Sequence, residues 1–152
     1  MLQVMETYPL AKLISLAFLL VLLPPGMALV PSLEEQAGAL LAWKDTLESS
    51  PAQLQSWGRE NNNSWPCSWH GIQCSKHRAR HQEVITGISI QGLQLRGKLE
   101  SLNFTALRTL TSIQLSNNQI RGSFPPALAS SLPNLRHLML QENELSGEIH
   151  FA

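Results

Sequence analysis

The feature that most constrains the fold of this chain is a pattern that recurs every 25 residues between residues 85 and 149. Two copies align at seven positions, Leu110, Ile113, Leu115, Asn118, Ile120, Gly122 and Phe124 in one and Leu135, Leu138, Leu140, Asn143, Leu145, Gly147 and Ile149 in the next. A preceding copy keeps the spacing with leucine in place of asparagine, at Ile85, Ile88, Ile90, Leu93, Leu95, Gly97 and Leu99. Because one such unit cannot bury its own apolar face, neighbouring units must form the core together.

Each copy contains five residues in which polar and apolar side chains alternate, at 87–91, 112–116 and 137–141. Such alternation is typical of a short strand with one face turned inward. Asn118 and Asn143 follow these strands, where a buried amide can bond the backbone groups of a turn and form an asparagine ladder. A period of roughly 20–29 residues carrying L-x-x-L-x-L-x-x-N-x-L is the signature of the leucine-rich repeat. We therefore predict an α/β solenoid with a short parallel sheet on its concave side.

Three segments are predicted along the chain. Residues 1–28 have the features of a secretory signal peptide, because the apolar run 13–23 precedes a small-x-small site that ends at Ala28. That run is too short to span a membrane, which takes about 20 residues. Residues 29–82 are predicted to form an amino-terminal cap with helices and a disulfide loop. Residues 83–152 are predicted to form about three repeats, incomplete at the carboxyl end.

Two helices are predicted in the cap. The first runs from Ser32 to Leu47 and opens with a Ser-x-x-Glu capping box. The second runs from Pro51 to Gln55, with Ser50 as its cap and with Leu54 and Trp57 turned toward the solenoid. We expect both helices to cover the first strand, since the terminal repeat of a solenoid exposes an apolar end.

The cap also contains the chain's two cysteines, Cys67 and Cys74, which lie seven positions apart. A signal peptide directs the chain to an oxidising compartment, so we predict a disulfide between them. Closing so short a loop stabilises a fold by about 2–3 kcal/mol in the chain-entropy model. Three tryptophans are expected to pack around the bond, Trp57, Trp65 and Trp69, and residues 75–82 are expected to form a solvated loop.

Patterns that could indicate a metal site or an enzyme are weak. His70 and His77 could join the two cysteines as zinc ligands, but the secretory context favours the disulfide. The run Gly92-x4-Gly97-Lys98 resembles a phosphate-binding loop, yet Leu99 stands where a serine or threonine must reach magnesium. Hydrolase, metalloprotease and kinase motifs are absent from the sequence. We therefore expect neither enzymatic activity nor a cofactor.

Charge and sequons limit the partners and the compartment. Eleven basic and eleven acidic residues cancel, so nucleic acid and anionic membranes are not expected as partners. Asn62 and Asn103 begin Asn-x-Ser/Thr triplets, which can accept glycans in a secreted protein. Asn103 is expected on the outer side of the stack, away from the concave face.

Several motifs together carry a family resemblance. They are E-Q-A-G-A-L-L-A-W at 35–43, Ser56-Trp57, W-P-C-S-W-H-G-I-Q-C at 65–74, and the repeat ending L-x-G-x-I/F-P. From Ser32 onward the chain resembles the amino end of the extracellular part of plant leucine-rich-repeat receptor-like kinases. This resemblance implies a helical cap with a paired Cys67 and Cys74, followed by a superhelical ectodomain that binds peptides, steroids or co-receptors.

The chain departs from the family pattern in two ways. The proline of the repeat is kept at Pro125 but replaced by Glu100 and His150 in the flanking copies, and Leu93 replaces the first ladder asparagine. The 152 residues also lack further repeats, a closing cap, a transmembrane helix and the serine/threonine kinase that a full-length relative is expected to carry. Membrane attachment is therefore expected only through missing downstream sequence.

Two functions remain open at this point. The first is an extracellular recognition module, secreted or on the outer face of the plasma membrane, that binds a protein or peptide ligand or a co-receptor ectodomain. The second is a small secreted leucine-rich-repeat protein that acts as an enzyme inhibitor or a receptor decoy. In either case the binding residues are expected among outward strand positions, and the candidates are Gln114, Ser116, His137, Met139 and Gln141.

Overall fold

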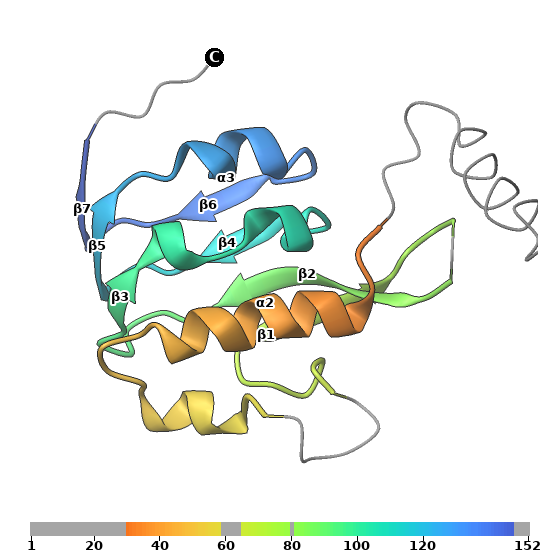
Figure 1. The fold of residues 1–152 in the computed structure, drawn as a ribbon, viewed down its shortest axis with the longest axis horizontal. Helices are drawn as coiled ribbons and strands as arrows, with labels where there is room; N and C mark the ends of the chain where they lie inside the picture. Colours follow the sequence, from red (N-terminus) through yellow and green to blue (C-terminus); the bar gives the residue numbers. More distant parts are fainter. Residues whose placement is uncertain (1–29, 59–64, 80, 148–152) are drawn as a thin grey trace, which may run out of the picture.

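The computed structural model describes residues 30–58, 65–79 and 81–147 (Figure 1). The predicted signal peptide, the Asn62 sequon and Ile149 lie outside these residues. The elements, in chain order, are α2 (Leu33–Asp45), η1 (Ala52–Ser56), β1 (Ile72–Lys76), β2 (Glu83–Ser89), β3 (Arg96–Lys98), η2 (Leu99–Ser101), η3 (Phe104–Leu107), β4 (Ser112–Gln114), β5 (Gln119–Ser123), α3 (Pro126–Ser131), β6 (His137–Met139) and β7 (Glu144–Ser146).

The predicted solenoid is confirmed by the sheet topology. Strands β2, β4 and β6 run parallel in one sheet, with Ile88 beside Ile113 and Ile113 beside Leu138, so each repeat advances the register by one period. Figure 1 shows the helices of the cap at one end of this stack and α3 with β6 at the other. A second parallel sheet of β3, β5 and β7 follows the carboxyl ends of these strands and was not predicted.

The core lies between successive repeats. In the middle copy the side chains of Leu110, Ile113 and Leu115 are fully buried, because repeats or cap elements cover them on both sides. Leu138 occupies the same place in the last copy as Ile113 in the middle one, yet it is 38% exposed. Each repeat is thus completed by the unit that follows it, as expected for a one-dimensional stack.

The first cap helix begins as predicted and ends earlier. Ser32 and Glu35 form the capping box, with each side chain accepting a hydrogen bond from the backbone N–H of the other. The helix ends at Asp45 rather than Leu47 because Thr46 closes it, donating its hydroxyl to the carbonyl of Trp43 at 2.7 Å. Its Oγ1 thereby satisfies one of the carbonyls that a helix end leaves unpaired.

The second cap helix differs from the prediction. It is a 3-10 helix from Ala52 to Ser56, and the extended residue before it is Pro51, so Ser50 lies one position too early to cap it. Leu54 and Trp57 are buried as expected. Proline fixes only its own φ, and here its ψ of 153° keeps it outside the helix.

The edge of the first repeat is covered by a strand that the sequence did not reveal. Ser75 and Lys76, predicted to lie in a loop, belong to β1, which pairs antiparallel with β2. Cys74 lies beside Ile85, and Lys76 lies beside Glu83. The lid over the first repeat therefore consists of two helices and a strand, and the strand satisfies the backbone groups that β2 would otherwise expose.

A buried glutamine fixes α2 on the repeats. Gln36 is fully buried, and its Oε1 accepts hydrogen bonds from the N–H of Ile85 at 2.7 Å and the hydroxyl of Thr109 at 3.2 Å. Its Nε2 donates to the carbonyl of Pro31 at 2.8 Å. One side chain thus joins the cap to the first and second repeats, a role that the sequence pattern alone did not indicate.

Four tryptophans form a continuous aromatic row beneath the repeats. Trp57 and Trp69 stack with ring centroids 5.5 Å apart, Trp65 meets Trp69 edge-on at 5.9 Å, and Trp43 contacts Trp57 at 6.5 Å. Trp43 was not predicted to belong to this group. It is fully buried and donates its indole N–H to the carbonyl of Lys98 at 3.0 Å, which links the cap to the first repeat.

Glu100, which replaces the proline of the family pattern, contacts the following repeat. Its Oε1 accepts hydrogen bonds from the backbone N–H of Ser123 at 2.6 Å and from the Ser123 hydroxyl. These bonds, with a smaller contribution from the charge of Lys98, lower the pKa of Glu100 below its usual value of 4.5. The substitution thus exchanges a rigid turn for a polar contact between repeats.

This lowered pKa predicts a dependence of stability on pH. A carboxyl group whose pKa is lower in the folded state than in the unfolded state stabilises the fold at pH values above its unfolded-state pKa. That contribution is lost as the pH falls through the folded-state pKa. We expect the unfolding free energy to decline below pH 4.5, and less steeply in Glu100→Gln. Urea titrations of both proteins across this range measure the difference. Glu142→Gln is the control, and parallel curves for the original chain and Glu100→Gln would contradict the assignment.

Candidate functional site

The four-stranded sheet presents nine outward side-chain positions, which we call the sheet face: 87, 89 and 91 of the first repeat, 112, 114 and 116 of the second, and 137, 139 and 141 of the third. The residues between them, such as Ile88 and Ile113, are buried in the core, so the alternation predicted from the sequence places these nine on the other side. Gly87 is covered, because the side chain of Gln73 from β1 lies over it. A Cβ at Gly87 would meet Gln73 Oε1 at 2.6 Å.

Within the first two repeats the polar side chains of the sheet face bond to one another. Gln91 donates its Nε2 to Gln114 Oε1 at 2.8 Å, and Ser116 donates its hydroxyl to Gln91 Oε1 at 2.9 Å. Ser89 donates its hydroxyl to the same Gln114 oxygen at 3.3 Å. A ligand that used Gln114 would have to compete with these internal bonds.

Ser116 therefore departs from the prediction. It was nominated as an exposed binding residue, but only 6% of it is exposed. The reason is the residue one period earlier, because the side chain of Gln91 is long enough to reach the neighbouring repeat and cover the serine. Gln114 is half-buried in the same network.

The third repeat presents a different surface. His137, Met139 and Gln141 are all exposed, with Met139 at 39%. Within the described part of the chain, none of their side chains forms a hydrogen bond to another residue. The third repeat therefore offers an imidazole, a thioether and an amide that need not break internal bonds to meet a partner.

The ladder asparagines occupy the turn after each strand. Asn118 accepts hydrogen bonds from the N–H groups of Leu93 and Leu95 at 3.1 and 3.0 Å, and it donates to the carbonyls of Ile90 and Leu115 at 2.7 and 2.9 Å. Each asparagine thus bonds its own repeat and the one before. The first repeat follows the cap instead of another repeat, which explains why Leu93 can stand in place of an asparagine there.

The predicted cysteine pair is disulfide-bonded in the structure, Cys67 to Cys74. Both sulfurs are therefore used, so they are not available as ligands for the zinc site that His70 and His77 would complete. Among the described residues, no group of three or more His, Cys, Asp or Glu side chains lies close enough together to hold a metal ion.

Asn103 lies on the surface at the start of η3. Its Oδ1 accepts a hydrogen bond from the N–H of Ala106 at 3.4 Å, which leaves the side-chain nitrogen, the atom that carries a glycan, outside this bond. The residue is exposed and is not part of the sheet face.

Comparison with known families identifies both parts of the chain. Residues 33–75 match the model of the leucine rich repeat N-terminal domain, and residues 109–131 match the model of the leucine rich repeat. The chain carries a leucine-rich-repeat cap and leucine-rich repeats. The solved structures that resemble it include plant receptor ectodomains, which confirms the predicted resemblance.

Two curated relatives are receptor kinases of Arabidopsis thaliana. The leucine-rich repeat receptor-like serine/threonine-protein kinase RGI4 is 37% identical over 80 residues, which cover 53% of this chain and 7% of that protein. The kinase RGI3 is 32% identical over 80 residues, with the same two coverages. This leucine-rich-repeat chain thus spans only a small part of the length of these relatives.

Two solved structures from Arabidopsis thaliana share the fold closely. The BIR2 ectodomain superposes with a TM-score of 0.64 at 28% identity, covering 75% of this chain and 58% of its own. A chain of the BIR3–SERK2 complex superposes with a TM-score of 0.60 at 33% identity, covering 73% of this chain and 57% of its own.

In the described part of the leucine-rich-repeat chain, none of the helices has the length and apolarity that crossing a membrane requires.

Proposed function

We propose that the chain is an extracellular recognition module of a plant receptor-like kinase ectodomain, which binds a peptide ligand or a co-receptor ectodomain through its sheet face. The observation that carries this proposal is the third repeat, where His137 and Met139 of β6 and Gln141 just after it are exposed, with no hydrogen bonds from their side chains to other described residues. Exposed side chains on a rigid sheet are suited to recognition, because little order is lost when a partner contacts them.

The relatives support the same conclusion. RGI4 and RGI3 are receptor-like kinases, and one of the similar structures is a complex of two proteins, BIR3 and SERK2. We propose that residues 1–28 direct secretion, that residues 29–82 cap the solenoid, and that residues 83–152 supply repeats for binding. In this arrangement Asn62 and Asn103 accept glycans, and Asn103 keeps its glycan away from the sheet face.

The test uses the secreted chain and panels of secreted plant peptides and co-receptor ectodomains, including SERK2, in biolayer interferometry. For any partner that binds, the triple variant His137→Ala, Met139→Ala and Gln141→Ala is expected to weaken binding about tenfold or more, because contact residues near the centre of an interface carry most of its affinity. Gln53→Ala with Gln55→Ala alters exposed cap residues and serves as the control. Equal weakening by both variants would contradict the assignment of the sheet face.

Single substitutions distinguish the second repeat of the sheet face from the third. Gln114→Ala removes a residue that already bonds within the protein, so we expect it to weaken partner binding less than Met139→Ala does. The measurement is the dissociation rate of the same partner from each variant. A larger effect of Gln114→Ala would move the binding centre to the second repeat.

A further inference from the structure

A groove of about 660 Å³ lies at the rim of the four-stranded sheet where its parallel strands begin. It is bordered by the end of the β1–β2 hairpin and by the turns that precede β4 and β6. We call it the basic groove, after the cationic side chains among its lining residues, which are Lys76, Arg78, Arg108 and Arg136, together with His77. Among the described residues, no acidic side chain lines it.

The repeat geometry gathers these charges from distant parts of the sequence. Arg108 and Arg136 come from the turns before two successive strands, whereas Lys76 and Arg78 come from the hairpin of the cap. The chain has no net charge, so its composition gives no sign of such a cluster.

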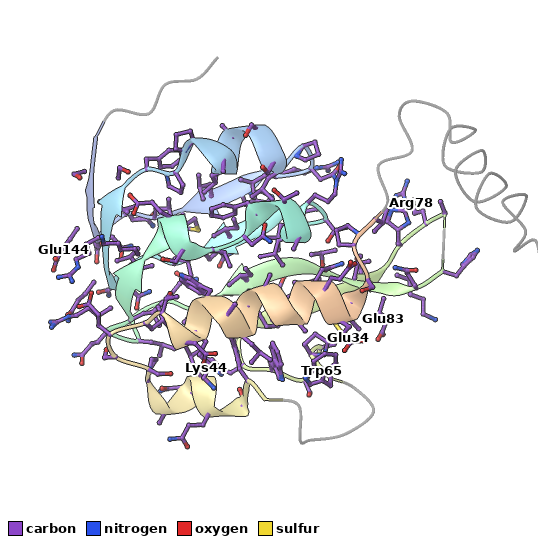
Figure 2. The ribbon with its side chains drawn as sticks, viewed as in Figure 1. Glu34, Lys44, Trp65, Arg78, Glu83 and Glu144 are labelled. Atoms are coloured by element: carbon purple, nitrogen blue, oxygen red, sulfur yellow. A yellow bond between two sulfur atoms is a disulfide. The ribbon has the colours of Figure 1, made fainter. Side chains whose placement is uncertain are left out.

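None of the cations of the basic groove forms an ion pair with another described residue. The ion pair found in the described part of the chain joins Arg121 and Glu48, which do not line the groove. Glu83 is the acidic residue paired in register with Lys76, but its carboxylate lies 3.9 Å from the sulfur of Cys67. Figure 2 shows Arg78 above the hairpin and Glu83 below it, so the hairpin separates the two charges.

An array of like charges around one concavity raises the local positive potential and concentrates anions there. Three of the four cations are arginines, and a guanidinium holds a carboxylate through two parallel hydrogen bonds in a fixed geometry. The groove has the volume of an ordinary ligand site. Its chemistry therefore selects a ligand that carries several anionic groups.

The residues at the floor of the groove indicate the chemistry of the part of the ligand that lies between its anionic groups. Thr86 and Thr111 donate their hydroxyls within the protein, to the carbonyls of Gln73 and Thr86, so they offer a ligand their methyl groups and acceptor oxygens. Val84 and Pro133 add apolar surface. In the part of the chain that the structure describes, the lining contains no tryptophan, tyrosine or phenylalanine ring on which a sugar could stack.

We propose that the basic groove binds an acidic peptide segment, with its carboxylates on the arginines and its small apolar side chains on the floor. This surface is additional to the sheet face of the proposed function. It uses different residues, so the failure of either binding test leaves the other standing.

The test uses the full secreted chain and a fluorescent ten-residue peptide of alternating glutamate and alanine, measured by fluorescence anisotropy. We expect saturable binding that weakens as NaCl is raised, because salt screens exposed charges. Arg108→Gln with Arg136→Gln is expected to weaken binding about tenfold or more. The control, Arg96→Gln with Lys98→Gln, removes the same net charge from β3 and is expected to change affinity less than about twofold.

Three results would overturn the proposal. One is equal weakening by the groove and control variants, which would mean that overall charge alone attracts the peptide. Another is equal binding of a peptide with glutamine in place of glutamate. The third is binding of an oligogalacturonate at the groove without binding of the acidic peptide. Thermal melting of both double variants checks their folding, and the single variants Arg108→Gln and Arg136→Gln replace a double variant that does not fold.

Discussion

Replacing Asn118 with alanine is expected to lower the free energy of unfolding by about 3–5 kcal/mol, because it leaves several buried backbone groups without partners at once. The asparagine is only 8% exposed and bonds two N–H groups of the first repeat as well as carbonyls of both repeats. Water cannot enter to replace these bonds while the neighbouring leucines remain packed. Urea denaturation of the secreted chain, followed by tryptophan fluorescence, measures the loss.

Asn143→Ala is the matched control for this prediction. Asn143 occupies the same place one period later, but it is half-exposed, and its Oδ1 accepts one backbone hydrogen bond, from Ile120, where Asn118 accepts two. Solvent can therefore satisfy part of what Asn143 supplies, and we expect a loss of about 1–2 kcal/mol. If Asn143→Ala proved as costly as Asn118→Ala, burial would not be what gives the ladder its strength.

The same contrast shows why the repeats could be predicted from the sequence. The apolar residues of each repeat are buried by the repeats one period away. Apolar residues must therefore recur in the sequence at that fixed interval. Ile88, Ile113 and Leu138 pair in the register that this interval demands. The asparagines recur for the same reason, since each turn leaves the same backbone groups to be satisfied.

Elements that depend on a single partner were not visible in this way. Strand β1 has one buried residue, Ile72, among five, and it exists because it pairs with β2 and is tied by the disulfide. The strands of the second sheet are three to five residues long, which is too short for alternating polar and apolar residues to predict a strand. Their order comes from stacking in register, not from their own sequence.

The candidate site shows a similar limit. Exposure of alternate strand positions follows from the pleat, and it holds for His137, Met139 and Gln141. It fails for Ser116, because the size of the residue one period earlier decides whether a small side chain remains open. The basic groove was hidden for another reason, since a net charge of zero says nothing about where cations from separate turns are brought together.

Replacing Trp43 with alanine is expected to lower the free energy of unfolding by about 3–5 kcal/mol, the usual cost of truncating a buried aromatic residue. Trp43 is fully buried, packs on Trp57 and donates to the Lys98 carbonyl. Trp43→Phe keeps most of the apolar volume and loses the N–H, so it is expected to cost less than half as much. Urea denaturation measured by far-ultraviolet circular dichroism compares the three proteins without relying on the altered fluorophore.

The place along the stack where stability is lost in Trp43→Ala shows whether Trp43 stabilises the cap interface or the whole stack. Trp43 belongs to the cap, and in a one-dimensional array each repeat is stabilised chiefly by its neighbours. Hydrogen exchange in Trp43→Ala should therefore accelerate most in β2, which lies against the cap, and less in β4 (Figure 1). Uniform acceleration across β2, β4 and β6 would show instead that the cap and the repeats unfold as one unit. In that case the tryptophan would stabilise the whole stack and not its first interface.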